Sequence, residues 1–159
     1  MKTKPFTFLL ALTFLFLFSG SVYGDDIQDA HDAANKGDFK TAYKLFVLLA
    51  EQGNAEAQVS LGVMYQKGLG VSQDYKEAVK WYRISAEQGY AETQFILGTM
   101  YKDGQGVLQD YALAHMWFNL CGSRGNKDCV KNRSMVEGKM TPQQIEKAQE
   151  MAGNWKPKK

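Results

Sequence analysis

The sequence has little of what many enzymes and nucleic-acid-binding proteins depend on, namely histidine and an excess of charge of one sign. Its 159 residues include two histidines, 19 basic residues and 17 acidic residues. Lys2 and Lys4 account for the basic excess, so the remaining chain has 17 basic and 17 acidic residues and a formal net charge of zero. A neutral, mixed surface lacks the basic patch expected for nucleic-acid binding. It also gives little attraction to an anionic membrane.

Motifs for metal binding and catalysis are missing as well. Two cysteines without clustered histidines do not make a zinc site, and their spacing differs from the C-x-x-C of a redox pair. After residue 24 the chain contains none of the serine-enzyme motifs S-x-x-K, S-D-N, K-T-G and G-x-S-x-G. His31 and His115 lie at no motif spacing from a cysteine or serine, and we interpret both as surface or groove histidines. We therefore expect no cofactor and no metal, and nothing here argues for an enzyme.

A hydrophobic segment follows the N-terminal lysines. Phe6–Phe18 is apolar apart from two threonines, and no charged residue follows it until Asp25. Val22 and Gly24 occupy the −3 and −1 positions of a cleavable secretory signal. We expect residues 1–24 to be removed and the protein to be exported to the periplasm or secreted. An uncleaved signal that anchors the chain is the alternative, although the apolar run is short for a membrane span.

An internal repeat dominates the rest of the chain. Residues 50–85 and 86–121 are identical at 19 of 36 aligned positions. A fixed period of this length is typical of a stacked helical repeat array. Asp38, Asp74 and Asp110 follow the same period, so the array extends to a third, upstream unit.

Every segment after residue 24 has the pattern of a helix followed by a short turn. Apolar residues recur at helical spacing, and the three periodic aspartates are natural N-caps. Near the C-terminus, Thr141 is placed to cap a last helix, with Pro142 in its first turn and Gln144 at the capping-box position. The expected helices span 25–36, 39–52, 55–66, 75–88, 91–102, 111–122 and 129–138, followed by the last helix after Thr141.

These helices predict an all-α fold, a short α-solenoid of antiparallel helix pairs with a C-terminal capping helix. Each pair buries its apolar face only against its neighbours, so about three pairs are needed for stability. The expected pairs span about 25–53, 54–89 and 90–125, and the cap spans 129–155. Residues 156–159 form a basic tail that we expect to be solvated.

Two turns, KGLGVSQD and DGQGVLQD, contain a G-x-G sequence. A nucleotide-binding loop would need the full G-x-G-x-x-G spacing after a strand, or a GK[ST] sequence, and both turns lack these features. Glycine also permits a positive φ, which lets the chain leave one helix sharply before the aspartate cap of the next. We therefore interpret both glycine pairs as turns.

On these residues the sequence resembles the Sel-one-like repeat (SLR), a relative of the tetratricopeptide repeat with a longer loop inside the repeat. AEAQVSLGVMYQKGLGVSQDYKEAVKWYRISAEQG and AETQFILGTMYKDGQGVLQDYALAHMWFNLCGSRG are two copies. They share A-x-x-x-x-x-L-G-x-M-Y, then G-x-G-V-x-x-D, then A-x-x-W. The resemblance covers about residues 25–155. The first helix pair departs from the pattern, because only K-G-D links its helices.

Cys121 and Cys129 occupy positions that face each other across a tight turn between two helices of such an array. The equivalent positions in other repeats also hold small residues, such as Ser85 and Thr93. A secretory signal implies an oxidising compartment. The spacing resembles that of the cysteine-rich SLR proteins of bacteria, in which each such pair is a disulfide. We therefore predict a disulfide between Cys121 and Cys129.

The resemblance also implies a binding surface, because the first helix of each pair lines the concave face of tetratricopeptide-type arrays. This face mixes apolar and charged groups, which suits an extended peptide or a partner helix. Phe95 is the expected anchor, since aromatic residues often dominate such interfaces. The positions carried over are His31, Asn35, Glu56, Val59, Val63, Gln66, Lys67, Glu92, Phe95, Thr99, Lys102 and Asp103.

The resemblance implies an exported adaptor or scaffold that binds a protein or peptide partner in its concave groove. The alternative is a hydrolase or binder that acts on cell-wall or β-lactam-like compounds, because some cysteine-rich SLR proteins have been linked to penicillin binding or β-lactam hydrolysis. The sequence does not indicate which partner is bound.

Overall fold

In the computed structural model, residues 22–158 are described, with side chains from Asp26 onward. These residues form eight α-helices and no strand, which confirms the all-α prediction. The helices are α1 (Val22–Asn35), α2 (Phe39–Glu51), α3 (Ala55–Lys67), α4 (Tyr75–Glu87), α5 (Ala91–Asp103), α6 (Tyr111–Gly122), α7 (Lys127–Glu137) and α8 (Pro142–Asn154).

Two helices begin earlier than expected. The expected signal peptide lies outside the described residues except for its last three, and α1 already includes these. Helix α7 begins at Lys127, because Asn126 caps it by accepting hydrogen bonds from the backbone amides of Asp128 and Cys129. No helix within residues 22–158 is both long enough and apolar enough to cross a membrane.

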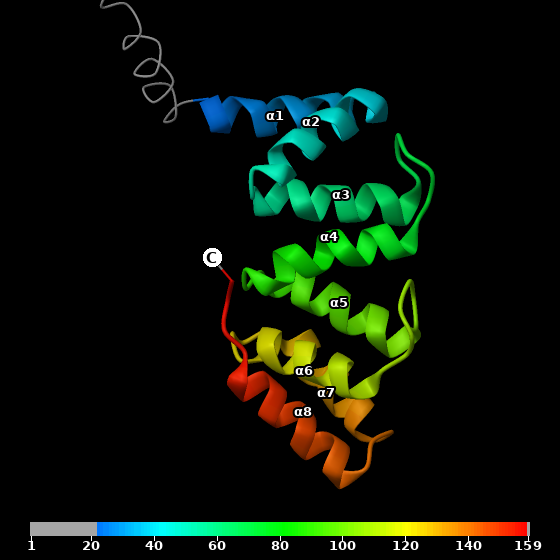
Figure 1. Cartoon of the computed structure of the whole chain (residues 1–159), viewed down its shortest axis with the longest axis vertical. Coiled ribbons are helices and arrows are strands. Elements are labelled where there is room, and N and C mark those ends of the chain that lie inside the picture. The colour runs from blue at the N-terminus through cyan, green and yellow to red at the C-terminus, as the bar shows by residue number, and fades with distance from the viewer. Residues whose placement is uncertain (1–21, 159) are drawn as a thin grey trace, which may run out of the picture.

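The helices stack as antiparallel pairs along one direction, with α1 at one end and α7 and α8 at the other (Figure 1). From α1 to α7, each helix packs on the next one in the chain, whereas α8 packs on α6. The expected solenoid with a closing helix is therefore confirmed. The capping box of the closing helix is also present, because Thr141 and Gln144 exchange side chain-to-backbone hydrogen bonds.

The glycine of the L-G-x-M-Y motif makes room for an aromatic ring on the next helix. A Cβ atom on Gly62 would lie 2.4 Å from the ring of Tyr82, and one on Gly98 would lie 2.7 Å from the ring of Phe118. Both rings are fully buried, and burial raises the pKa of Tyr82 well above its ordinary value. The motif therefore allows close contact between α3 and α4, and between α5 and α6.

The second glycine of each G-x-G turn presses against the backbone of the preceding pair. Gly70 and Gly106 have φ values of +70° and +69°. A Cβ atom on either would lie 2.3 Å from a carbonyl oxygen, that of Phe39 or of Tyr75 respectively. These two residues begin α2 and α4. Each G-x-G loop thus packs against the start of an earlier helix, and this close packing requires glycine at the second position.

Aspartate caps follow the turns, as the repeat period predicts. The Asp38 carboxylate accepts a hydrogen bond from the Thr41 amide, Asp74 accepts from two amides, and Asp110 accepts from the Leu113 amide. The hydrogen bonds with Thr41 lower the pKa of Asp38 below its ordinary value. These caps satisfy amide groups that the first turn of a helix leaves without an intrahelical partner.

Residues 156–158 of the basic tail are exposed, as expected for a solvated segment, but Lys158 also contacts the fold. The backbone amide of Lys158 donates to the carbonyl oxygen of Glu87 at 2.8 Å, and its Nζ lies 2.7 Å from Glu87 Oε2. Glu87 is the last residue of α4, so the chain turns back from α8 to the middle of the stack (Figure 1). The tail is therefore attached to the fold at Lys158.

Candidate functional site

A cavity of about 190 Å³ lies between α1, α2 and α3. Phe46 and Met64, which are 2% and 4% exposed, belong to its wall and to the core beneath it. His31 closes one side, with its ring edge-on to the Phe46 ring at a centroid distance of 5.1 Å. The cavity is lined by His31, Ala34, Phe39, Phe46, Val59, Ser60, Val63, Met64 and Leu69. This mainly apolar lining fits one apolar side chain of a ligand.

A hydrogen-bonding contact joins α1 and α3 beside this cavity. His31 Nε2 lies 2.8 Å from Glu56 Oε1, and their side chains are 36% and 64% exposed. The structure therefore brings together four of the predicted groove residues: His31 and Glu56 in this contact, and Val59 and Val63 in the cavity wall.

The equivalent positions of the next repeat carry larger side chains. Thirty-six residues after Val59 and Ser60 the chain has Phe95 and Ile96, and both pack against the core cluster of the second half. The Phe95 ring lies 5.9 Å from the Phe118 ring, centroid to centroid. Larger side chains thus stand at the positions that Val59 and Ser60 occupy in the first repeat. Phe95 stays a predicted anchor, but part of its surface packs internally.

The remaining predicted groove residues are spread along α1, α3 and α5. Gln66 accepts a hydrogen bond from the Tyr82 hydroxyl at 2.8 Å, and Thr99 donates to the carbonyl oxygen of Phe95 at 3.1 Å. Lys102 Nζ lies 3.5 Å from Asn132 Oδ1 and 3.6 Å from the Asp103 carboxylate. The Gln66 contact joins α3 to α4 and the contact with Asn132 joins α5 to α7, whereas the other two lie within α5. The exposed residues of the set are Asn35, Glu56, Lys67, Glu92 and Asp103.

Sequence reasoning missed a set of contacts between the second helix of one repeat and the first helix of the next. The hydroxyl groups of Tyr43 on α2 and Tyr65 on α3 are 2.7 Å apart. This hydrogen bond and burial raise the pKa of Tyr65 to about 12. We call the equivalent positions of the three repeats the junction pairs: Tyr43 and Tyr65, Val79 and Tyr101, His115 and Glu137.

The third junction pair corrects the interpretation of His115 as a surface or groove histidine. His115 is fully buried, and its Nε2 lies 2.7 Å from Glu137 Oε1. Arg133 extends the contact, because its Nε lies 3.5 Å from the same carboxylate and its Nη1 donates to Asn119 Oδ1 at 2.8 Å. Within residues 22–158, His115 Nδ1 has no hydrogen-bond partner. The repeat register, which aligns His115 with Tyr43, was the signal that could have revealed its place.

The predicted disulfide is confirmed. Cys121 on α6 and Cys129 on α7 are joined, and both are fully buried. Among the described side chains, no group of three or more His, Cys, Asp or Glu residues is arranged to hold a metal ion.

Comparisons with known proteins agree with this architecture. The sequence profile of the Sel1 repeat matches residues 33–54, 55–90 and 91–126. The crystal structure of a protective antigen present in uropathogenic Escherichia coli strains, which displays an SLR fold, matches with a TM-score of 0.76 and 30% identity. That match covers 82% of this chain and 29% of the antigen. A search of curated proteins gave no match.

A second solved structure, a Sel1 repeat protein from Oxalobacter formigenes, matches with a TM-score of 0.65 and 25% identity over 82% of this chain and 56% of that one. The chain thus spans less than a third of the first protein and just over half of the second. Sel1 repeat proteins are generally non-catalytic scaffolds that bind other proteins. Because three contiguous repeats match over more than half of its length, this chain belongs to the Sel1 repeat family.

Proposed function

We propose that this protein is an exported adaptor that holds a peptide segment of a partner protein against α1, α3 and α5. The cavity between α1, α2 and α3 is the observation that carries the proposal. Its apolar wall suits one bulky apolar side chain of the partner. His31 and Glu56 stand beside it, where they offer hydrogen-bonding groups to the partner's backbone.

The second repeat supplies residues that can be copied into the first repeat to fill the cavity. Phe95 and Ile96 stand at the equivalent positions of the second repeat and pack against its core, so the double substitution Val59→Phe with Ser60→Ile introduces larger side chains that this fold already carries there. Lys76→Ala is the matched control, because it copies Ala112 onto an exposed position of α4.

A displayed peptide library, selected on each protein, tests the proposal. The wild type and Lys76→Ala should enrich the same peptides, with one bulky apolar residue in common. The filled variant should bind those peptides at least about tenfold more weakly, a loss of about 1.4 kcal/mol. If the filled variant keeps its fold and selects the same peptides with equal affinity, the binding site lies elsewhere.

Export is part of the proposal, and the apolar segment ahead of Asp25 supports it. Fractionation of producing cells, with the mass of the recovered chain, tests this part. A mature chain that begins at Asp25 outside the cytoplasm is the expected result. A membrane-bound chain that retains residues 1–24 would favour an anchored scaffold instead.

A further inference from the structure

A second pocket, of about 530 Å³, lies at the edge of the stack where α2 and α4 end. It shares no lining residue with the cavity between α1, α2 and α3. Two carboxylates from equivalent repeat positions, Glu51 and Glu87, stand beside an apolar wall of Trp81 and Ile84. The full lining is Ala50, Glu51, Gly53, Gln58, Trp81, Ile84, Glu87, Gln88 and Lys158.

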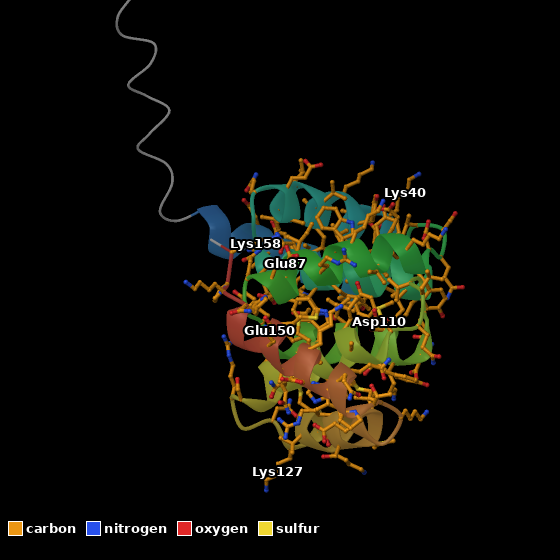
Figure 2. The ribbon with its side chains drawn as sticks, turned by 60° about the horizontal axis from the view of Figure 1, so that its bottom comes forward. Lys40, Glu87, Asp110, Lys127, Glu150 and Lys158 are labelled. Carbon is orange, nitrogen blue, oxygen red and sulfur yellow. A yellow bond between two sulfur atoms is a disulfide. The ribbon has the colours of Figure 1, made fainter. Side chains whose placement is uncertain are left out.

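The C-terminal tail shows which chemical group this pocket accepts. Lys158 donates its backbone amide to the Glu87 carbonyl oxygen at 2.8 Å, as an extended segment would, and its ammonium group lies 2.7 Å from the Glu87 carboxylate. Figure 2 shows Lys158 beside Glu87, although the two residues are 71 positions apart in the chain. The pocket therefore binds a backbone amide and a cationic side chain together.

The tail uses only part of the pocket. Among the described residues Glu51 makes no ion pair, so two carboxylates face one lysine. Ile84 remains 41% exposed beside them. A pair of side-chain amides forms the base of the pocket, because Gln88 Nε2 donates to Gln58 Oε1 at 2.8 Å and Gln58 Nε2 donates to the Ala50 carbonyl oxygen at 3.2 Å. The described part of the tail thus leaves the Glu51 carboxylate without an ion pair and the apolar wall partly exposed, above a hydrogen-bonded base.

We propose that this pocket binds an extended, lysine- or arginine-bearing segment of a partner polypeptide, and that the tail occupies the pocket until a partner displaces it. An exposed ion pair is a weak contact, and the Lys158 side chain is 71% exposed. The tail is favoured because it is tethered, with an effective concentration in the millimolar range. A partner that adds a second cation for Glu51 and an apolar residue for Trp81 gains contacts that the tail does not make.

A dye-labelled peptide with the sequence of residues 154–159 is a suitable probe, and fluorescence anisotropy of the full-length protein is the measurement. Lys158→Ala frees Glu87 and should bind the peptide about threefold to fivefold more tightly than the wild type, because the tethered competitor is weakened. Adding Glu87→Gln to Lys158→Ala should reverse that gain in affinity, by about threefold to fivefold. Adding Glu146→Gln, an exposed carboxylate on α8, is the matched control and should leave it unchanged.

Three results would overturn the proposal. The first is equal affinity for the peptide in the wild type and Lys158→Ala, including no binding by either. The second is full affinity in Lys158→Ala with Glu87→Gln. The third applies if circular dichroism shows that Glu87→Gln does not fold. In that case a second peptide, with norleucine in place of lysine, is measured on Lys158→Ala. If it binds as tightly as the original peptide, no cation is recognised. The adaptor groove on α1 and α3 is untouched by all of these variants.

Discussion

Replacing Gly106 with alanine should greatly lower the free energy of unfolding, although it adds only one methyl group. Its φ of +69° lies in the left-handed region, where a residue with a Cβ loses about 1–2 kcal/mol. The new Cβ would also lie 2.3 Å from the carbonyl oxygen and 2.5 Å from the carbonyl carbon of Tyr75. Both are backbone atoms of the first residue of α4, so neither can rotate away. The turn would have to shift, at a further cost of about 1–3 kcal/mol.

The expected loss for Gly106→Ala is therefore about 2–5 kcal/mol, measured by urea unfolding of the oxidised protein. Two other glycines separate the contributions. Gly37 has a φ of +80°, and a Cβ atom placed on it would meet no atom within 4 Å, so Gly37→Ala should lose only the backbone cost. Gly153 lies in α8 in open space, so Gly153→Ala should be neutral or stabilising by up to about 1 kcal/mol. If Gly106→Ala loses no more than Gly37→Ala, the turn does not rest on α4.

Three further outcomes follow from the contacts between helices. Reducing the disulfide should lower the free energy of unfolding by about 2 kcal/mol, because the closed loop is short, and an unchanged urea midpoint in reductant would contradict this. The hydrogen bond with Tyr43 and burial raise the pKa of Tyr65 from 10.0 to about 12, so their stabilisation is complete below pH 10 and is lost as the pH rises toward 12. Ultraviolet titration of tyrosinate should show this late ionisation, and Tyr43→Phe should move it to lower pH. Finally, His115→Tyr combined with Glu137→Tyr copies the first junction pair, and a double-mutant cycle should give a favourable coupling of about 1–3 kcal/mol. Purely additive losses would show that the pair is not a unit.

The sequence predicted those features that repeat with the period. Asp74 and Asp110 cap equivalent helices, and Gly70 and Gly106 make equivalent turns, because each position is dictated by the local geometry of one repeat. The disulfide belongs to the same class, since the equivalent residues of the preceding repeat, Ser85 and Thr93, also face each other, with their hydroxyl oxygens 3.1 Å apart. A register is enough to predict such contacts without knowing which side chains lie opposite.

The features that escaped prediction depend on partners that differ from one repeat to the next. His115 is buried and meets Glu137 on α7, whereas the first repeat places two tyrosines at the equivalent positions. The contact between Lys158 and Glu87 is still harder to predict from the sequence, because no periodicity relates the two residues. The cavity beside His31 depends on the volumes of Val59 and Ser60, and helical spacing does not report volume.

The unequal support of the helices has a consequence for how binding and order are connected. Helix α6 packs on α5, α7 and α8 and carries the disulfide, whereas α1, at the end of the stack, packs mainly on α2. In arrays whose units touch only their neighbours, local opening begins where the fewest contacts must break. The first pair is therefore the part of the fold that opens at the lowest free energy, and it supplies two of the three walls of the groove cavity. A ligand that fills the cavity would be bound by the ordered first pair and not by the opened one. A ligand bound in the cavity would thus slow amide hydrogen exchange in α1 far more than in α6. Binding could then be followed by the protection of α1 alone.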